Sequence, residues 1–150
     1  MYEFLKYRVC DAMSEQPLTL GPDVSLADAE ALFEQHDFNA LPVVDDDGLL
    51  IGVFTKLDLL KAFGDIDGRM FAPYEEIMKR PVENFMTSVP HVASATPRTP
   101  LTKALQKMLE LRAKSLPVVD DERVVGMIAR EDILKALRRA VAGEAPSEPI

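Results

Sequence analysis

Two short apolar runs that enclose an acidic turn occur twice along the chain. The first copy extends from Leu41 to Phe63 and the second from Leu116 to Leu137, so their first leucines stand 75 residues apart. Each apolar run has the length of a strand, and Gly48 in the first turn suits the positive φ that a tight hairpin requires. The repetition predicts one supersecondary unit, strand, turn, strand and helix, used twice.

Each hairpin is preceded by a segment with helical periodicity. In the first copy, Ser25 occupies an N-cap position, and the apolar residues that follow recur at three- and four-residue intervals as far as residues 36–39. In the second copy, Thr99 and Pro100 are predicted to supply the N-cap and the first helical position. Both segments are therefore predicted to be amphipathic helices.

A second helix is predicted after each hairpin. In the first copy it begins at Thr55 and stops at Gly64. In the second copy it extends to about Ala142, and Gly143 is the expected C-terminal stop. Elsewhere the pattern is weaker: residues 2–9 fit a short helix or an added strand, and residues 74–79 fit one or two helical turns.

Each copy alone has too few strands to bury its apolar faces, because a lone hairpin is marginal in water. We therefore expect an α/β (α+β) fold in which two β-α-β-β-α repeats pack by pseudo-twofold symmetry and leave two related clefts. The predicted boundaries are an N-terminal segment at 1–12, repeat 1 at 13–64, an inter-repeat insert at 65–84, repeat 2 at 85–142 and a flexible tail at 143–150.

Composition and charge exclude several classes of function. The 150 residues are 47% hydrophobic and carry a net charge of −8, which disfavours binding to nucleic acid or to an anionic membrane surface. No signal-peptide pattern or membrane-spanning run is recognisable, so a cytoplasmic location is expected. Cys10 is the single cysteine, and no spacing typical of a metal site or of a catalytic triad occurs, so neither a metal site nor an enzyme is expected.

The doubled motif carries a family resemblance. The sequence LPVVDD, followed by Gly52-x-x-Thr55-x-x-Asp58 and repeated over roughly 9–64 and 82–140, resembles a tandem pair of CBS (cystathionine β-synthase) domains, also called a Bateman module. The resemblance implies a stand-alone regulatory protein that is not an enzyme and requires no cofactor. It also implies a regulatory ligand, namely AMP, ADP, ATP or S-adenosylmethionine, together with a homodimer and a further protein partner to which occupancy is signalled.

The resemblance also implies which residues bind the ligand. In this family the aspartate accepts hydrogen bonds from the ribose hydroxyls, and residues before the Leu-Pro of the other repeat hold the adenine. One predicted cleft combines Phe54, Thr55, Lys56 and Asp58 with Ser94, Lys114, Ser115 and Leu116. The other combines Ile128, Arg130 and Asp132 with Thr19, Asn39, Ala40 and Leu41. Met13 and Met86, at matching positions, are further candidates for lining the clefts.

The residues leave alternatives open. Thr55 and Asp58 have the spacing of a capping box, which requires no ligand. In the second copy Ala129 replaces the threonine but Asp132 is present, which favours a ligand role modestly and predicts that the Asp58 cleft is the stronger site. The alternative function is an interaction scaffold with vestigial nucleotide sites, in which the insert or the N-terminal segment docks a partner.

Overall fold

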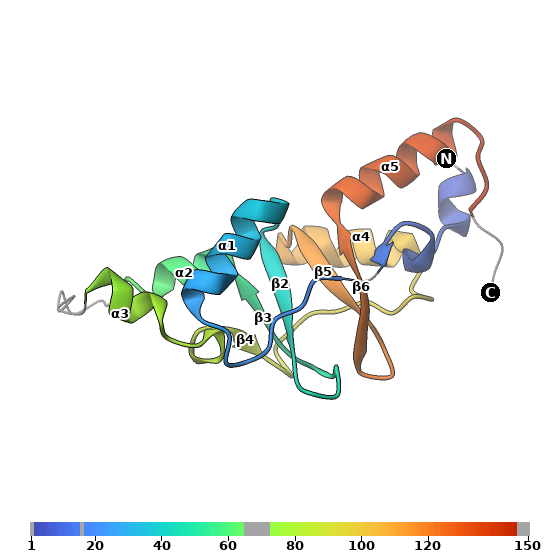
Figure 1. The fold of residues 1–150 in the computed structure, drawn as a ribbon. Coiled ribbons are helices and arrows are strands. Elements are labelled where there is room, and N and C mark those ends of the chain that lie inside the picture. Colours follow the sequence, from blue (N-terminus) through green and yellow to red (C-terminus); the bar gives the residue numbers. More distant parts are fainter. Residues whose placement is uncertain (1, 16, 65–72, 147–150) are drawn as a thin grey trace. The chain divides into compact units, whose positions relative to one another are not determined.

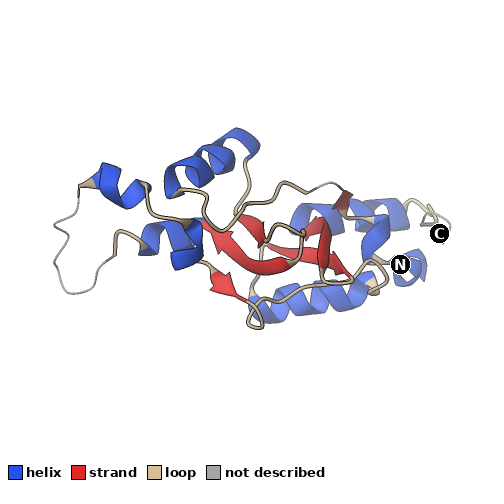
Figure 2. Ribbon diagram, turned by 60° about the horizontal axis from the view of Figure 1, so that its bottom comes forward, coloured by secondary structure: helices blue, strands red, loops and turns tan. Residues whose placement is uncertain are grey.

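The computed structural model describes residues 2–15, 17–64 and 73–146, and these residues form two compact units (Figure 1). Unit 1 contains Met1–Pro17 and Ala93–Ile150, and unit 2 contains Leu18–Val92. Both units combine helices with a small antiparallel sheet (Figure 2), which confirms the predicted α/β class. Residues 65–72 of the predicted insert, with their Asp65-x-Asp67-Gly68 sequence, and residues 147–150 of the predicted tail lie outside the described residues.

Unit 2 is built on a three-stranded antiparallel sheet of order β2-β3-β4. Its elements are α1 (Leu26–His36), β2 (Ala40–Val44), β3 (Leu50–Thr55), α2 (Lys56–Lys61), α3 (Tyr74–Met78), the 3-10 helix η3 (Val82–Asn84) and β4 (Thr87–Ser88). The hairpin and the two predicted helices are confirmed, and α3 confirms the predicted helical turns before Pro81.

Unit 1 is built on a sheet of order β1-β6-β5. Its elements are the 3-10 helices η1 (Tyr2–Lys6) and η2 (Val9–Asp11), β1 (Ser14–Glu15), α4 (Leu101–Leu111), β5 (Ser115–Asp120), β6 (Arg123–Ala129) and α5 (Arg130–Val141). The helical alternative for the start of the chain is therefore the observed one. Figure 1 shows η1 beside the end of α5, against which it packs.

The two-residue strands join each sheet at a glycine. In unit 1, β1 pairs with β6, and a Cβ placed on Gly126 would lie 2.7 Å from the carbonyl oxygen of Ser14 and 2.9 Å from Sδ of Met13. In unit 2, β4 pairs with β3, and a Cβ on Gly52 would lie 2.6 Å from Sδ of Met86. The segment that opens the first repeat thus belongs to the sheet of the second hairpin, and the segment that opens the second repeat belongs to the sheet of the first.

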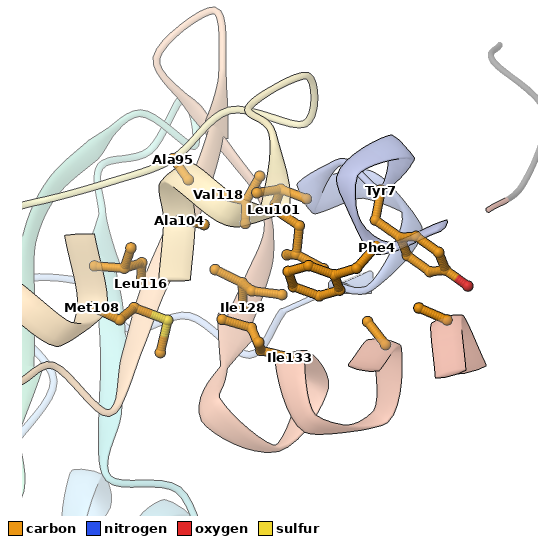
Figure 3. Packing of buried hydrophobic residues seen from close by; sticks show 13 residues of the cluster. Phe4, Tyr7, Ala95, Leu101, Ala104, Met108, Leu116, Val118, Ile128 and Ile133 are labelled. Atoms are coloured by element: carbon orange, nitrogen blue, oxygen red, sulfur yellow. The ribbon is translucent and has the colours of Figure 1, made fainter. Parts of the chain in front are cut away.

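Each unit has its own apolar core. In unit 1, Phe4 and Tyr7 from the N-terminal segment pack among buried side chains of α4, β5, β6 and α5 (Figure 3). The Tyr7 hydroxyl donates a 3.0 Å hydrogen bond to the carbonyl oxygen of Glu144, and the Arg139 guanidinium lies 5.4 Å from the ring centroid. In unit 2, Phe33 of α1 stacks on Phe54 of β3 at 5.9 Å.

Most of the predicted helix and turn signals are confirmed. Ser25 caps α1 by accepting a 3.1 Å hydrogen bond from the backbone N–H of Asp28, and both Gly48 and Gly143 have φ of +82°. The prediction for α4 was wrong by one residue: Pro100 occupies the N-cap position. The Thr99 hydroxyl instead contacts Thr96 at 3.0 Å, because the loop before α4 folds back on itself.

Candidate functional site

Asp58 lies at the junction between β3 and α2 in unit 2. Its Oδ2 accepts a 2.9 Å hydrogen bond from the backbone N–H of Thr55, and its own N–H donates to Oγ1 of Thr55 at 3.1 Å. This is the reciprocal capping box that the sequence offered as an alternative. Asp58 is 4% exposed, and it is the single charged residue that is buried among the residues described. Capping uses one acceptor position of Oδ2, so the remaining positions of the carboxylate, including both on Oδ1, can accept hydrogen bonds from a ligand.

Asp132 occupies the equivalent junction between β6 and α5 in unit 1. Its Oδ2 accepts a 2.8 Å hydrogen bond from the backbone N–H of Ala129. Ala129 has no hydroxyl to accept a hydrogen bond from the backbone N–H of Asp132. Burial raises the pKa of Asp132 above its ordinary value, and the Ala129 hydrogen bond opposes that shift. The carboxylate therefore holds the same place in both units although half of the capping box is missing in one.

The start of the neighbouring strand lies directly beside each aspartate junction. In unit 2, Ala40 pairs with Thr55, and the Lys56 N–H donates to the Asn39 carbonyl at 3.1 Å. In unit 1, the same arrangement pairs Ser115 with Ala129, and the Arg130 N–H donates to the Lys114 carbonyl at 3.1 Å. Each unit thus places a carboxylate, a basic residue and the residues before Leu-Pro at one end of its hairpin.

Within a unit, the structure brings together one half of each predicted residue set. Unit 2 contains Phe54, Thr55, Lys56 and Asp58 along with Thr19, Asn39, Ala40 and Leu41, and unit 1 contains Ile128, Arg130 and Asp132 along with Ser94, Lys114, Ser115 and Leu116. The side chains of Phe54, Leu41, Leu116 and Ile128 are at most 2% exposed and belong to the two cores. These four residues can therefore meet a ligand mainly through their backbone. The sets as a whole remain predictions.

The two basic residues beside the aspartates are engaged differently. The Arg130 guanidinium donates from Nε to the Ala113 carbonyl at 3.1 Å and from Nη2 to the Arg112 carbonyl at 3.2 Å, at the end of α4. Lys56 is exposed, and its ammonium has no hydrogen bond or ion pair with any part of the chain that the structure describes. Sequence reasoning placed Lys56 and Arg130 in the two predicted clefts and missed this role of Arg130, which no local spacing signals.

An apolar groove of about 410 Å³ lies between α4 and α5 in unit 1. Leucines at 105, 109, 134 and 137 line it together with Arg112 and Arg130. Leu109 is 69% exposed and Leu134 49% exposed. A patch of this kind on a small domain often marks an interaction surface.

Comparison with known proteins identifies the family. The family model described as the CBS domain matches this chain twice, at residues 9–65 and 75–139. The chain belongs to the CBS domain family. It is a tandem CBS pair, as the doubled motif indicated. The CBS domain-containing protein YhcV of Bacillus subtilis is 31% identical to it over 83% of this chain and 81% of that protein.

Solved structures of CBS proteins share the fold of this CBS pair. CBSX2 in complex with AMP is 28% identical with a TM-score of 0.75, over 90% of this chain and 98% of that one. The CBS domain pair of protein MJ0100, in complex with 5′-methylthioadenosine and S-adenosyl-L-methionine, is 30% identical with a TM-score of 0.71, over 91% and 97% of the two chains.

Several enzymes also match this CBS pair, but over a small part of their length. L-aspartate semialdehyde sulfurtransferase of Methanocaldococcus jannaschii is 32% identical over 83% of this chain and 22% of the enzyme. Among the described residues no group of three His, Cys, Asp or Glu side chains is placed to hold a metal ion. No helix in residues 2–15, 17–64 or 73–146 has the length and apolar character needed to cross a membrane.

Proposed function

We propose that this CBS pair is a non-catalytic regulatory module that binds adenosine-containing ligands and signals their presence to a partner. The observation that carries the proposal is the pair of equivalent carboxylates, Asp58 and Asp132, each fixed by the N–H three residues before it. The structures of CBSX2 with AMP and of the MJ0100 pair with 5′-methylthioadenosine and S-adenosyl-L-methionine support the class of ligand.

The chemistry of a carboxylate suits this role. An ionised carboxylate only accepts hydrogen bonds, and its two oxygens have about four acceptor positions. The backbone N–H of Thr55 or Ala129 uses one of these positions and holds the side chain in one orientation. The remaining positions can accept from the two vicinal hydroxyls of a ribose. The capping role and the ligand role are therefore compatible in the same residue.

The proposed binding residues are the two sets predicted from the resemblance. One set is Phe54, Thr55, Lys56 and Asp58 with Ser94, Lys114, Ser115 and Leu116. The other is Ile128, Arg130 and Asp132 with Thr19, Asn39, Ala40 and Leu41. In both sets the residues before Leu-Pro, which are Lys114 and Ser115 in the first and Asn39 and Ala40 in the second, would hold the adenine.

The proposal also includes a homodimer in which the groove of unit 1 is covered by the same groove of a second copy. The positions of α1 that correspond to Leu105 and Leu109 of α4 are Glu30 and Glu34, so the α1 half of the equivalent surface in unit 2 is acidic rather than apolar. Unit 2 also carries 14 acidic and 5 basic residues, whereas unit 1 carries 11 and 12. Contact between copies through unit 1 buries leucine against leucine and avoids desolvating carboxylates.

Light scattering of size-exclusion fractions tests the dimer. Leu109→Glu should convert it to monomer, whereas Leu57→Glu, at a 60% exposed leucine of α2, should leave it intact. A wild-type monomer, or equal effects of the two variants, would contradict the proposed interface.

Calorimetric titration with AMP, ADP, ATP and S-adenosylmethionine tests ligand binding. Asp58→Asn and Asp132→Asn keep an acceptor for the capping N–H but lose acceptor capacity for ribose, so each should abolish one site. Asp11→Asn is the matched control, because Asp11 accepts the same kind of bond from the Arg8 N–H at 2.8 Å and belongs to neither set. If wild-type protein binds none of the four ligands, the sensor function is wrong and the scaffold alternative takes its place.

A further inference from the structure

The residues around the two aspartates differ in the positive charge that they can offer to a ligand. The junction in unit 2 reads Thr55-Lys56-Leu57-Asp58, and the junction in unit 1 reads 129–132, Ala-Arg-Glu-Asp. Lys56 is exposed and makes no hydrogen bond or ion pair with any described residue. An ammonium on a flexible stem of this kind can move to meet a phosphate group.

Arg130, at the position equivalent to Lys56, already forms hydrogen bonds within the protein. Its guanidinium donates through Nε and Nη2 to the carbonyls of Ala113 and Arg112, where α4 ends in a left-handed residue with φ of 53°. The carbonyls at the end of a helix lack intrahelical partners, and an arginine there is favourable for hydrogen bonding and for the helix dipole. Moving Arg130 onto a ligand phosphate would leave these carbonyls without their donor.

Two further differences reduce the capacity of the Asp132 site for an anion. Ala129 has no hydroxyl to donate to a phosphate oxygen, whereas Thr55 has one. Glu131 stands where unit 2 has Leu57, and its carboxylate adds negative charge beside Asp132, although Arg138 lies 3.6 Å from it. An added dianion is therefore poorly matched to this site.

We infer that the two sites select different chemical classes of ligand: the Asp58 site takes an adenosine compound with a phosphate, and the Asp132 site takes an adenosine compound without one. The inference rests on the proposed function and specifies it. Lys61 and Lys135 are equivalent and so do not distinguish the sites.

Calorimetry with AMP and adenosine, which differ only in the phosphate, tests the inference on single-site variants. Asp132→Asn leaves the Asp58 site and should bind AMP at least about tenfold more tightly than adenosine. Lys56→Gln in that background should reduce the affinity for AMP by about tenfold and leave the affinity for adenosine unchanged. Lys61→Gln, which removes another exposed lysine of the same helix, should change neither affinity. Asp58→Asn leaves the Asp132 site and should bind adenosine at least as tightly as AMP.

The possible outcomes separate the inference from the proposed function. If the Asp58→Asn variant prefers AMP by tenfold, or the Asp132→Asn variant shows no preference, the assignment of ligand classes is overturned while nucleotide binding stands. If wild-type protein binds neither compound, the proposed function fails and the inference fails with it. Lys56→Gln in the otherwise wild-type protein provides a second test that leaves both capping aspartates in place.

Discussion

The backbone N–H of Ala129 donates a 2.8 Å hydrogen bond to Oδ2 of Asp132, in the same geometry that joins Thr55 to Asp58. The backbone angles of the two N-cap residues agree closely, at φ −114° and ψ 164° for Ala129 and φ −115° and ψ 166° for Thr55. At the N-cap position the two junctions therefore differ in one hydroxyl rather than in backbone conformation. Substitutions at the two N-cap positions can therefore remove this hydroxyl from one junction and add it to the other.

Thr55→Ala and Ala129→Thr should change the free energy of unfolding in opposite directions. Thr55→Ala removes the acceptor for the Asp58 N–H and should lower the free energy of unfolding by about 1 kcal/mol. Ala129→Thr supplies the missing acceptor for the Asp132 N–H and should raise it by a similar amount. Urea unfolding followed by circular dichroism measures both changes. A loss of stability in Ala129→Thr would show that a hydroxyl cannot be accommodated at this junction.

Alanine in place of the strand glycines should be destabilising, because no space exists for a Cβ. At Gly126 the added atom would lie 2.7 Å from the Ser14 carbonyl oxygen, so β1 would have to move away from β6. We expect a loss of about 1–3 kcal/mol, the usual range for overpacking. Gly64→Ala is the control, since its Cβ would have no neighbour nearer than 3.7 Å. Thermal unfolding of both variants measures the difference, and equal midpoints would contradict the close approach.

Truncation of Arg130 should destabilise unit 1, whereas truncation of Lys56 should have little effect on the fold. Arg130→Met removes two hydrogen bonds to the carbonyls at the end of α4 and should lower the free energy of unfolding by about 1 kcal/mol. Lys56→Met removes an exposed side chain with no partner among the described residues. Hydrogen exchange of the last turn of α4 reports the loss directly. Equal protection in the two variants would count against the capping role of Arg130.

The carboxyl of Asp132 should make stability fall as pH rises through the acidic range. Its pKa is raised in the folded protein, chiefly by burial, above the value of about 3.9 expected in the unfolded chain. Between these two values the folded state binds more protons than the unfolded state, so the free energy of unfolding decreases with pH. Asp132→Asn lacks this component, so its free energy of unfolding should rise relative to that of wild type as pH increases from about 3.9 through the raised pKa of Asp132. Urea titrations at several pH values measure the free energy of unfolding of both proteins. If the two values change with pH in parallel, this prediction is wrong.

Local signals predicted those parts of the fold whose cause lies in a few neighbouring residues. Ser25, Gly48 and Gly143 are examples, since a side-chain cap or a positive φ depends on one residue and its immediate neighbours. Thr99 shows the limit of such signals: its hydroxyl had a choice of local partners, and it bonds to Thr96 rather than capping α4. Spacing alone could not decide between them.

The sequence by itself determined the duplication, the hairpins, their flanking helices and the equivalence of Asp58 and Asp132, because each depends on short-range periodicity and on comparison of one copy with the other. Tertiary structure alone decided that Met13 and Ser14 pack on Gly126 of the distant second hairpin, and that Arg130 reaches the end of α4. Contacts between segments so far apart depend on how the whole unit packs, because their loop-closure entropy must be offset by many contacts formed together.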